Sequence, residues 1–172
     1  PYVEPNWRRP STDQIVEFCE QKGIRTHGHV PVWGNRKWQM PYWYKNLMSE
    51  EERASFSRYF PNEPNRWASK DVHSREWTYM SFDESAEAFS TFIKNLDTAL
   101  ENRIKQIAER YGDSIYCMEV INETLCDSLN LPDRHSTDFF WADDLISWSF
   151  ETARRYLPKN ELVINEAAHL AW

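Results

Sequence analysis

The stretch Tyr116-Cys-Met-Glu-Val-Ile-Asn-Glu-Thr124 decides the fold class of this chain. It is rich in residues that favour β-strands, and it ends in the adjacent pair Asn122 and Glu123. A long amphipathic segment comes before it and a polar stretch follows. Parallel strands of α/β folds carry ionisable groups at their C-terminal ends, where these folds keep their chemistry. A carboxylate at that position, with an amide beside it, is the best functional lead in the sequence.

Helical and strand-like segments alternate along the whole chain. Ser11-Thr-Asp-Gln14 has the spacing of a capping box, and it begins a helix that Gly23 ends. The hydrophobic periodicity predicts six further elements. They are a strand at 24–32, a short helix at about 49–59, a helix at about 84–110, a strand at 114–123, a helix at about 138–157 and a strand at 161–165. This alternation predicts an α/β architecture with a parallel sheet.

Two of the predicted strands end in the same tripeptide, Ile-Asn-Glu, at residues 121–123 and 164–166. The repetition predicts that these strands are neighbouring staves of one barrel. Residues 34–85 form a long connection that is rich in aromatic side chains. A connection of this length inside a compact domain is more often a functional loop than filler.

The composition of the 172 residues fits a single domain with one sizeable core. Nine Trp, eight Tyr and nine Phe suggest a surface that stacks on flat ligands such as sugar rings, bases or aromatic partner residues. Simple filling of the core is the alternative. The net charge of −7 and the lack of a basic stripe argue against nucleic-acid binding. No apolar run has the length of a transmembrane helix, so we expect no membrane partner.

The ends and the cysteines add two expectations. The chain opens on Pro1-Tyr-Val-Glu-Pro5, which has no features of a signal peptide and reads as the middle of a longer protein. Its three cysteines are odd in number and lack the spacing of a metal site, so we expect reduced or buried thiols.

Strict alternation along the strand puts Glu119 and Glu123 on one face and Asn122 on the other. Glu119 and Glu123 would lie roughly 13 Å apart at about 3.3 Å per residue. That is too far for the two carboxylates of a retaining glycosidase, which are about 5–5.5 Å apart. We therefore expect Glu119 to be a buried, hydrogen-bonded carboxylate. A second catalytic carboxylate would come from another strand, and Glu166 is a candidate if the two strands are neighbours.

The pair His27 and His29 places two imidazoles on one face of the first strand. One interpretation is a metal site completed by a carboxylate, which would make a metal-dependent barrel hydrolase. The other is a hydrogen-bonding wall for a polar ligand beside Trp33. The pattern His-x-His does not decide between them, and we expect no metal and no cofactor.

Three segments together resemble glycoside hydrolase family 10, the retaining endo-β-1,4-xylanases with a (β/α)₈ TIM barrel. The first is Thr26-His-Gly-His-Val-Pro-Val-Trp33 with the following Gln39-Met-Pro-Tyr-Trp43, similar to the family's third strand and its Gln-x-Pro-x-Trp segment. The second is 111–123, similar to the fourth strand and its Asn-Glu end. The third is Leu162-Val-Ile-Asn-Glu166, similar to the fifth strand. The order and spacing agree apart from an insertion at about 54–85.

The resemblance implies a role for five residues. Glu123 would be the general acid/base. Asn122 would hydrogen-bond the 2-hydroxyl of the sugar being cleaved. His29 and Trp33 would line the subsite of that sugar, and Asn165 would bind substrate nearby at the cleft.

The sequence also departs from the family. Glu119 stands where the family has Asp, Gly34 where it has His, and Glu166-Ala-Ala-His169 where it has Asp-Tyr-Asn. The family's nucleophile is a Glu on the seventh strand, whereas these residues reach only the fifth. A (β/α)₈ barrel typically needs about 250 residues. We therefore expect residues 1–172 to be part of one catalytic domain, about strands three to five, completed by the same or another chain.

The resemblance implies a retaining glycoside hydrolase of β-1,4-xylan in which this segment carries the acid/base. Its partners would be xylan or xylo-oligosaccharide, and its location would be secreted or periplasmic. Two alternatives remain open at this point. One is a non-catalytic, carbohydrate-binding barrel fragment, and the other is the metal-dependent hydrolase built on His27 and His29.

Overall fold

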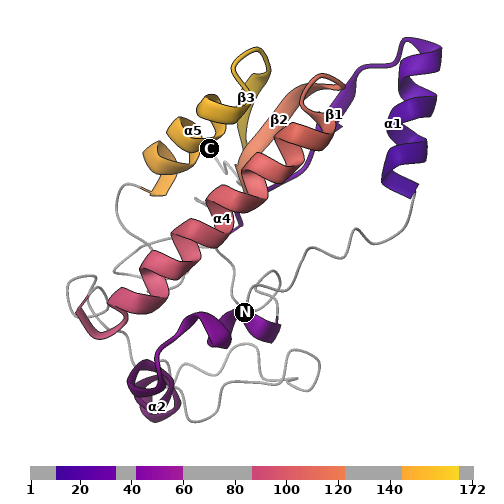
Figure 1. Ribbon diagram of the computed structural model, residues 1–172. Coiled ribbons are helices and arrows are strands. Elements are labelled where there is room, and N and C mark those ends of the chain that lie inside the picture. Colours follow the sequence, from indigo (N-terminus) through magenta and orange to yellow (C-terminus); the bar gives the residue numbers. More distant parts are fainter. Residues whose placement is uncertain (1–10, 34–41, 60–86, 123–144, 167–172) are drawn as a thin grey trace, which may run out of the picture.

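The computed structural model describes four parts of the chain, residues 11–33, 42–59, 87–122 and 145–166 (Figure 1). The elements are α1 (Ser11–Lys22), β1 (Thr26–Gly28), the 3₁₀ helix η1 (Tyr42–Leu47), α2 (Glu50–Tyr59), α4 (Ser90–Tyr111), β2 (Ile115–Asn122), α5 (Leu145–Tyr156) and β3 (Glu161–Asn165). The predicted alternation of helices and strands is confirmed over these residues. Most of the insertion expected at about 54–85 lies outside them, as do the first parts of the two long predicted helices.

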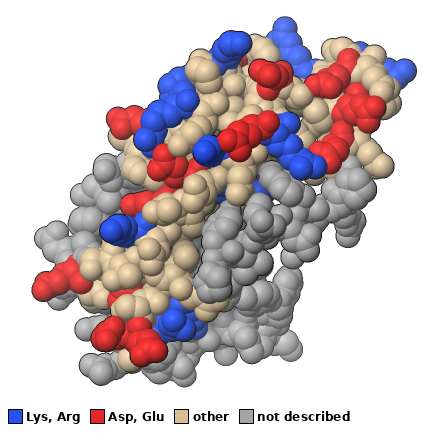
Figure 2. Space-filling model, in the orientation of Figure 1, with Lys and Arg blue, Asp and Glu red and all other residues tan. Residues whose placement is uncertain are grey.

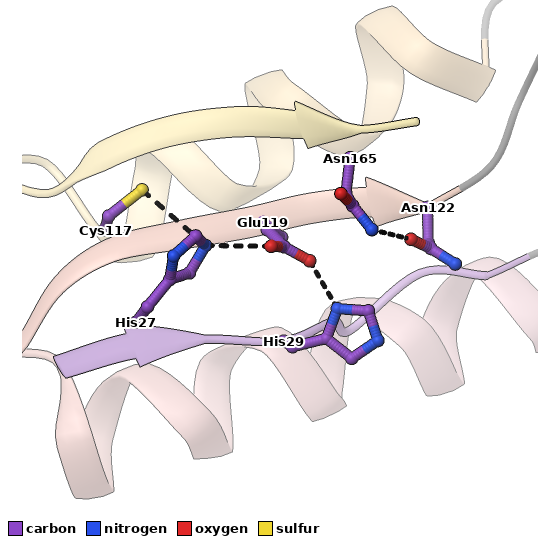
Figure 3. A network of polar contacts seen from close by, with 6 residues as sticks. All are labelled: His27, His29, Cys117, Glu119, Asn122 and Asn165. Carbon is purple, nitrogen blue, oxygen red and sulfur yellow. Dashed lines mark hydrogen bonds and ion pairs between the residues drawn. The ribbon is translucent and has the colours of Figure 1, made fainter. Parts of the chain in front are cut away.

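The described strands form one parallel sheet in the order β1-β2-β3. Ile121 pairs with Ile164, and Asn122 pairs with Asn165. The two Ile-Asn-Glu repeats therefore begin side by side and in register, which confirms that their strands are neighbours. Helices α4 and α5, which precede β2 and β3, lie together behind the sheet in Figure 3. Such an α/β unit has one sheet face covered by helices and the other face turned toward a barrel interior.

Strand β1 is shorter than the predicted 24–32. The chain leaves the sheet after Gly28 and returns at Val32, which forms an isolated parallel bridge with Ile121. The backbone N–H of Val32 donates to the Val120 carbonyl at 3.2 Å. Pro31 lies in the gap, and it cannot donate to a neighbouring strand because it has no N–H.

The core lies between the helix-covered face of the sheet and helices α4 and α5. One side of α4 is buried or partly buried against this core, through Phe92, Ile93, Leu96, Leu100, Ile104, Ile107, Ala108 and Tyr111. Fully buried members from β2, from α4 and α5, and from the residues next to these helices are Phe89, Phe92, Ile104, Val120, Ile121, Ala153 and Leu157. Gly28 lets β1 approach this layer, because a Cβ there would lie 2.7 Å from Met118 Cε.

Large apolar side chains are exposed beyond both outer strands. On the β1 side, Ile15 and Phe18 of α1 are 61% and 53% exposed, so the described residues do not cover these apolar side chains. On the β3 side, Ile146 and Ile164 are also exposed. The described residues thus leave apolar surface uncovered near both outer strands of the sheet.

The outer surface is charged but mixed in sign. Figure 2 shows Lys and Arg interspersed with Asp and Glu over the described part of the face that carries α4 and α1. None of the helices among the described residues has the length and apolar character needed to cross a membrane.

Candidate active site

Polar side chains gather on the face of the sheet opposite α4 and α5, toward the C-terminal ends of the strands (Figure 3). They come from β1 and the residue after it, from β2, and from the last residue of β3. The members are His27, His29, Cys117, Glu119, Asn122 and Asn165. Five of the residues predicted or weighed as site residues, all members except Cys117, are thus brought together by three adjacent strands.

A bulge in β2 puts Asn122 on the same face as Glu119. Glu119 pairs with Val163 and Asn122 pairs with Asn165, but the register shifts between Glu119 and Ile121. Val163 and Asn165 are two residues apart on β3, so they share a face, and their direct partners on β2 share it too. The prediction that Asn122 points away from Glu119 is therefore wrong, because the extra residue at Val120 interrupts the alternation.

Glu119 bridges the two imidazoles of the neighbouring strand. Its Oε1 lies 3.0 Å from His27 Nε2, and its Oε2 is hydrogen-bonded to His29 Nδ1. The Glu119 side chain is only 15% exposed, whereas both imidazoles are about half exposed at 52%. The expectation of a largely buried, hydrogen-bonded carboxylate is confirmed.

The geometry bears on the two interpretations of the histidine pair. One ring nitrogen of each imidazole faces the Glu119 carboxylate. Within the four described ranges, no group of three or more His, Cys, Asp or Glu side chains is placed to hold a metal ion. The structure therefore favours the hydrogen-bonding wall. With Nδ1–H donated to a carboxylate, the His29 ring presents Nε2 to a ligand.

Trp33 lies beside His29, as the sequence predicted. The ring centroids are 6.2 Å apart and the planes meet at 69°, an edge-to-face contact of the kind aromatic rings prefer. The indole Nε1 of Trp33 is buried and has no hydrogen-bond partner among the described residues. His29 and Trp33 thus form one continuous wall at the end of β1.

Asn122 is held from both sides. Its backbone N–H donates to the Val32 carbonyl at 3.0 Å, and its side-chain Oδ1 accepts a hydrogen bond of 2.5 Å from Asn165 Nδ2. Only 2% of Asn122 is exposed. Glu123, the residue predicted as acid/base, follows directly in sequence and lies outside the described residues.

Cys117 is the member of the cluster that sequence reasoning left without a role. Its Sγ lies 3.9 Å from His27 Nε2. Burial, with added repulsion from Glu161 and Glu119, raises the pKa of the Cys117 thiol above its ordinary value. A thiol with a raised pKa stays protonated at neutral pH, so it is a poor nucleophile. Cys117 is two residues from Glu119 on the same strand. This spacing could have predicted that both side chains lie on one face of the sheet.

Comparisons with known proteins identify the family of this chain. A profile of glycosyl hydrolase family 10 matches residues 4–169. The chain belongs to this family. Endo-1,4-beta-xylanase A of Halalkalibacterium halodurans is 27% identical over 154 residues, which are 89% of this chain and 31% of that protein. The family 10 chain thus spans about a third of the curated relative that it matches.

Solved structures of the family have the same fold. Xylanase B from Clostridium stercorarium F9 is similar with a TM-score of 0.62 at 21% identity, over 95% of this chain and 40% of that one. A psychrophilic family 10 endo-beta-1,4-xylanase has a TM-score of 0.56 at 23% identity, over 96% and 39%. These structures are TIM barrels, and the described α/β unit is part of such a barrel.

Proposed function

We propose that the full-length protein is a retaining endo-hydrolase of β-1,4-xylan and that Glu123 is its general acid/base. The observation that carries this proposal is the fixed end of β2. Asn122 is anchored to the residue after β1 through Val32 and to β3 through Asn165. Glu123 is the next residue, and its family counterpart has the acid/base role. The names of the relatives, endo-1,4-xylanases, support xylan as the substrate.

In the proposed reaction the Glu123 carboxylic acid protonates the glycosidic oxygen as the bond to the leaving sugar breaks. A nucleophilic carboxylate from the remainder of the barrel forms the glycosyl–enzyme ester. The Glu123 carboxylate then takes a proton from a water molecule, whose oxygen attacks the same carbon and releases the sugar with retained configuration.

The chain's described residues would bind and orient the sugar. His29, fixed through Nδ1 by Glu119, presents Nε2 to a hydroxyl group. Trp33 at its edge provides apolar surface for the sugar ring. Asn122 and Asn165 are the other two residues that we propose to take part in substrate binding. No step of this mechanism requires a metal ion or another cofactor.

Two further parts of the proposal concern what surrounds the chain. The exposed apolar residues Ile15, Phe18, Ile146 and Ile164 support completion of the barrel by the remaining strands, from the same or another chain. A polymeric substrate lies outside the cell, so we propose a secreted or periplasmic protein. Activity recovered with cytoplasmic markers after cell fractionation would contradict that location.

The acid/base assignment is tested by Glu123→Gln in the full-length protein. Loss of general acid catalysis is typically worth 10²–10⁴-fold, so xylan hydrolysis should fall by about 1,000-fold. An aryl xyloside with a good leaving group needs little acid assistance, so its first step should survive. Added azide should then restore turnover and yield a β-xylosyl azide. Glu161→Gln, on an exposed residue at the other end of the sheet, is the matched control and should keep full activity.

Largely intact xylan hydrolysis by the Glu123→Gln variant would overturn the assignment. A wild-type protein that binds xylo-oligosaccharide without releasing reducing ends would instead identify a non-catalytic carbohydrate-binding barrel. Proton NMR of the first product settles the stereochemistry, since a retaining enzyme releases the β-anomer first.

A further inference from the structure

The geometry of the two strand ends points to Asn165 as a positioning residue, whose side-chain amide fixes the orientation of the Asn122 amide toward the sugar. This inference rests on the proposed function. It goes further because it assigns Asn165 a role exerted through a second residue, where the family resemblance implies only contact with the substrate.

The contact between the two asparagines is built by the register of the sheet. Asn122 and Asn165 are direct partners on β2 and β3, and Asn165 Nδ2 donates to Asn122 Oδ1 at 2.5 Å. Figure 3 shows Asn165 directed at the Asn122 oxygen, while the nitrogen of Asn122 points away from Asn165. One atom of the Asn122 amide is thus engaged within the sheet, and the other is turned outward.

An asparagine amide has one acceptor oxygen and one nitrogen with two donor hydrogens. Rotation of the amide by 180° exchanges the two at little cost unless a partner selects one orientation. Asn165 selects it by donating to Oδ1. Asn122 therefore offers Nδ2 to a ligand as a donor, and a sugar hydroxyl oxygen is an acceptor that fits it.

The surroundings leave Asn122 little other freedom. It is 2% exposed, and its backbone N–H is bonded to the Val32 carbonyl. Without Asn165, the buried Asn122 oxygen loses its hydrogen-bond partner, which is unfavourable for the orientation seen here. The amide could then recover a partner by turning Oδ1 to the substrate, which removes the donor that the sugar needs.

The test compares two substrates in the full-length protein. One is an aryl β-xylobioside, and the other is its analogue without the 2-hydroxyl on the sugar to be cleaved. For Asn165→Ala we expect kcat/KM to fall about 10-fold with the first substrate and less than 2-fold with the analogue. The fall should appear mainly in kcat, because hydrogen bonds to this sugar strengthen in the transition state.

Two further variants sharpen the comparison. Asn165→Asp removes the donor, so Asn122 should turn Nδ2 toward the new carboxylate, and the loss with the 2-hydroxyl substrate should exceed that of Asn165→Ala. The double variant Asn122→Ala/Asn165→Ala should be no slower than Asn122→Ala, because Asn165 then has nothing to orient. Asn95→Ala is the control, since Asn95 of α4 donates to the Leu47 carbonyl of η1 and should affect neither substrate.

Equal losses with both substrates for Asn165→Ala, or additive losses in the double variant, would overturn the inference. Failure of the proposed function is a different result, because the wild type would then hydrolyse neither compound. In that case the affinity of xylohexaose, measured by calorimetry for the wild type and Asn165→Ala, carries the same comparison. For such a protein, which binds without hydrolysis, an affinity unchanged by Asn165→Ala would overturn the inference.

Discussion

The two ends of the sheet use polar side chains in different ways. At the end where β2 and β3 begin, Asn160 donates its Nδ2 to the Gly112 carbonyl at 2.8 Å and to the Ile115 carbonyl. At the end where the strands finish, Asn122 accepts one hydrogen bond and leaves its nitrogen turned outward. Both asparagines are buried, so the difference lies in what their polar atoms bind.

At the starting end, where β2 and β3 begin, polar side chains form hydrogen bonds and ion pairs with one another. Arg110 at the end of α4 holds Asp13 of α1 with Nη2 at 2.6 Å and Nε at 3.0 Å, and the Tyr111 hydroxyl donates to the same carboxylate at 2.7 Å. Tyr116 on β2 donates to Glu161 on β3 at 2.6 Å. These contacts join a helix to a helix and a strand to a strand.

At the finishing end, where the strands end, hydrogen bonds fix the side chains. Each of His29 and Asn122 keeps one polar atom for a ligand. Glu119 takes one nitrogen of His29 and leaves Nε2, and Asn165 takes the oxygen of Asn122 and leaves Nδ2. In TIM barrels, polar residues at the amino ends of strands serve stability and those at the carboxyl ends serve catalysis. The contacts of this chain give a physical reason for that division.

The largest effect is expected from breaking the carboxylate bridge at the finishing end. Glu119→Ala in the full-length protein releases both imidazoles, so we expect kcat/KM on xylo-oligosaccharide to fall 10- to 100-fold, about 1.4–2.7 kcal/mol. In Glu119→Gln the side-chain oxygen can accept a hydrogen bond from only one imidazole. The kcat/KM of this variant should therefore lie between those of Glu119→Ala and the wild type. Tyr116→Phe, which removes a contact at the starting end, is the control. A Glu119→Ala enzyme with unchanged kcat/KM would break the comparison.

The next effect is a loss of stability at the starting end. Arg154 Nη1 donates to the carbonyls of Leu157, Pro158 and Asn160 at 3.0–3.1 Å, in the turn that joins α5 to β3. Arg154→Ala should lower the free energy of unfolding by about 1–2 kcal/mol, measured by urea titration. Values of kcat/KM at 20 °C should not change. A loss of activity below the unfolding transition would show that this end also serves the chemistry.

A smaller loss of stability is expected from a polar contact near the beginning of α4. This contact lies away from the candidate active site, so it should affect stability and not activity. Glu52 is buried, and its carboxylate accepts from the backbone N–H groups of Thr91 at 2.7 Å and Phe92 at 3.1 Å. A negative charge is favourable at a helix N-terminus. Glu52→Gln should therefore cost about 1 kcal/mol of stability and leave kcat/KM unchanged, whereas the exposed control Glu151→Gln, in the middle of α5, should change neither.

The smallest effect is a pH dependence at the starting end. Hydrogen bonds from Arg110 and Tyr111 lower the pKa of Asp13 below its ordinary value of 3.8. The stabilisation is therefore present above pH 3.8 and is lost as the pH falls through the lower folded-state pKa. Asp13→Asn should lower the Tm at pH 7, and the difference from the wild type should shrink below about pH 3.8. A difference that persists unchanged at lower pH would exclude the charged pair as its cause.

The sequence predicted those features that depend on local pattern. The neighbouring position of β2 and β3 followed from their repeated Ile-Asn-Glu, and the shared face of His27 and His29 followed from the period of a strand. The bulge at Val120 did not, since the register of β2 against β3 depends on packing between strands. The Glu52 contact at the N-terminus of α4 also escaped prediction, because its partners lie about 40 residues away in sequence. The family resemblance named Glu123, which spacing alone left as one conspicuous carboxylate.

The most direct test of the division between the two ends is the matched pair Asn122→Ala and Asn160→Ala in the full-length protein, with kcat/KM at 20 °C and Tm measured for each. Both residues are buried, at 2% and 8% exposed. We expect Asn122→Ala to lose kcat/KM by 10-fold or more with the smaller change in Tm, and Asn160→Ala to lose more Tm with kcat/KM unchanged. The opposite pattern, or equal losses of both quantities in both variants, would contradict the account.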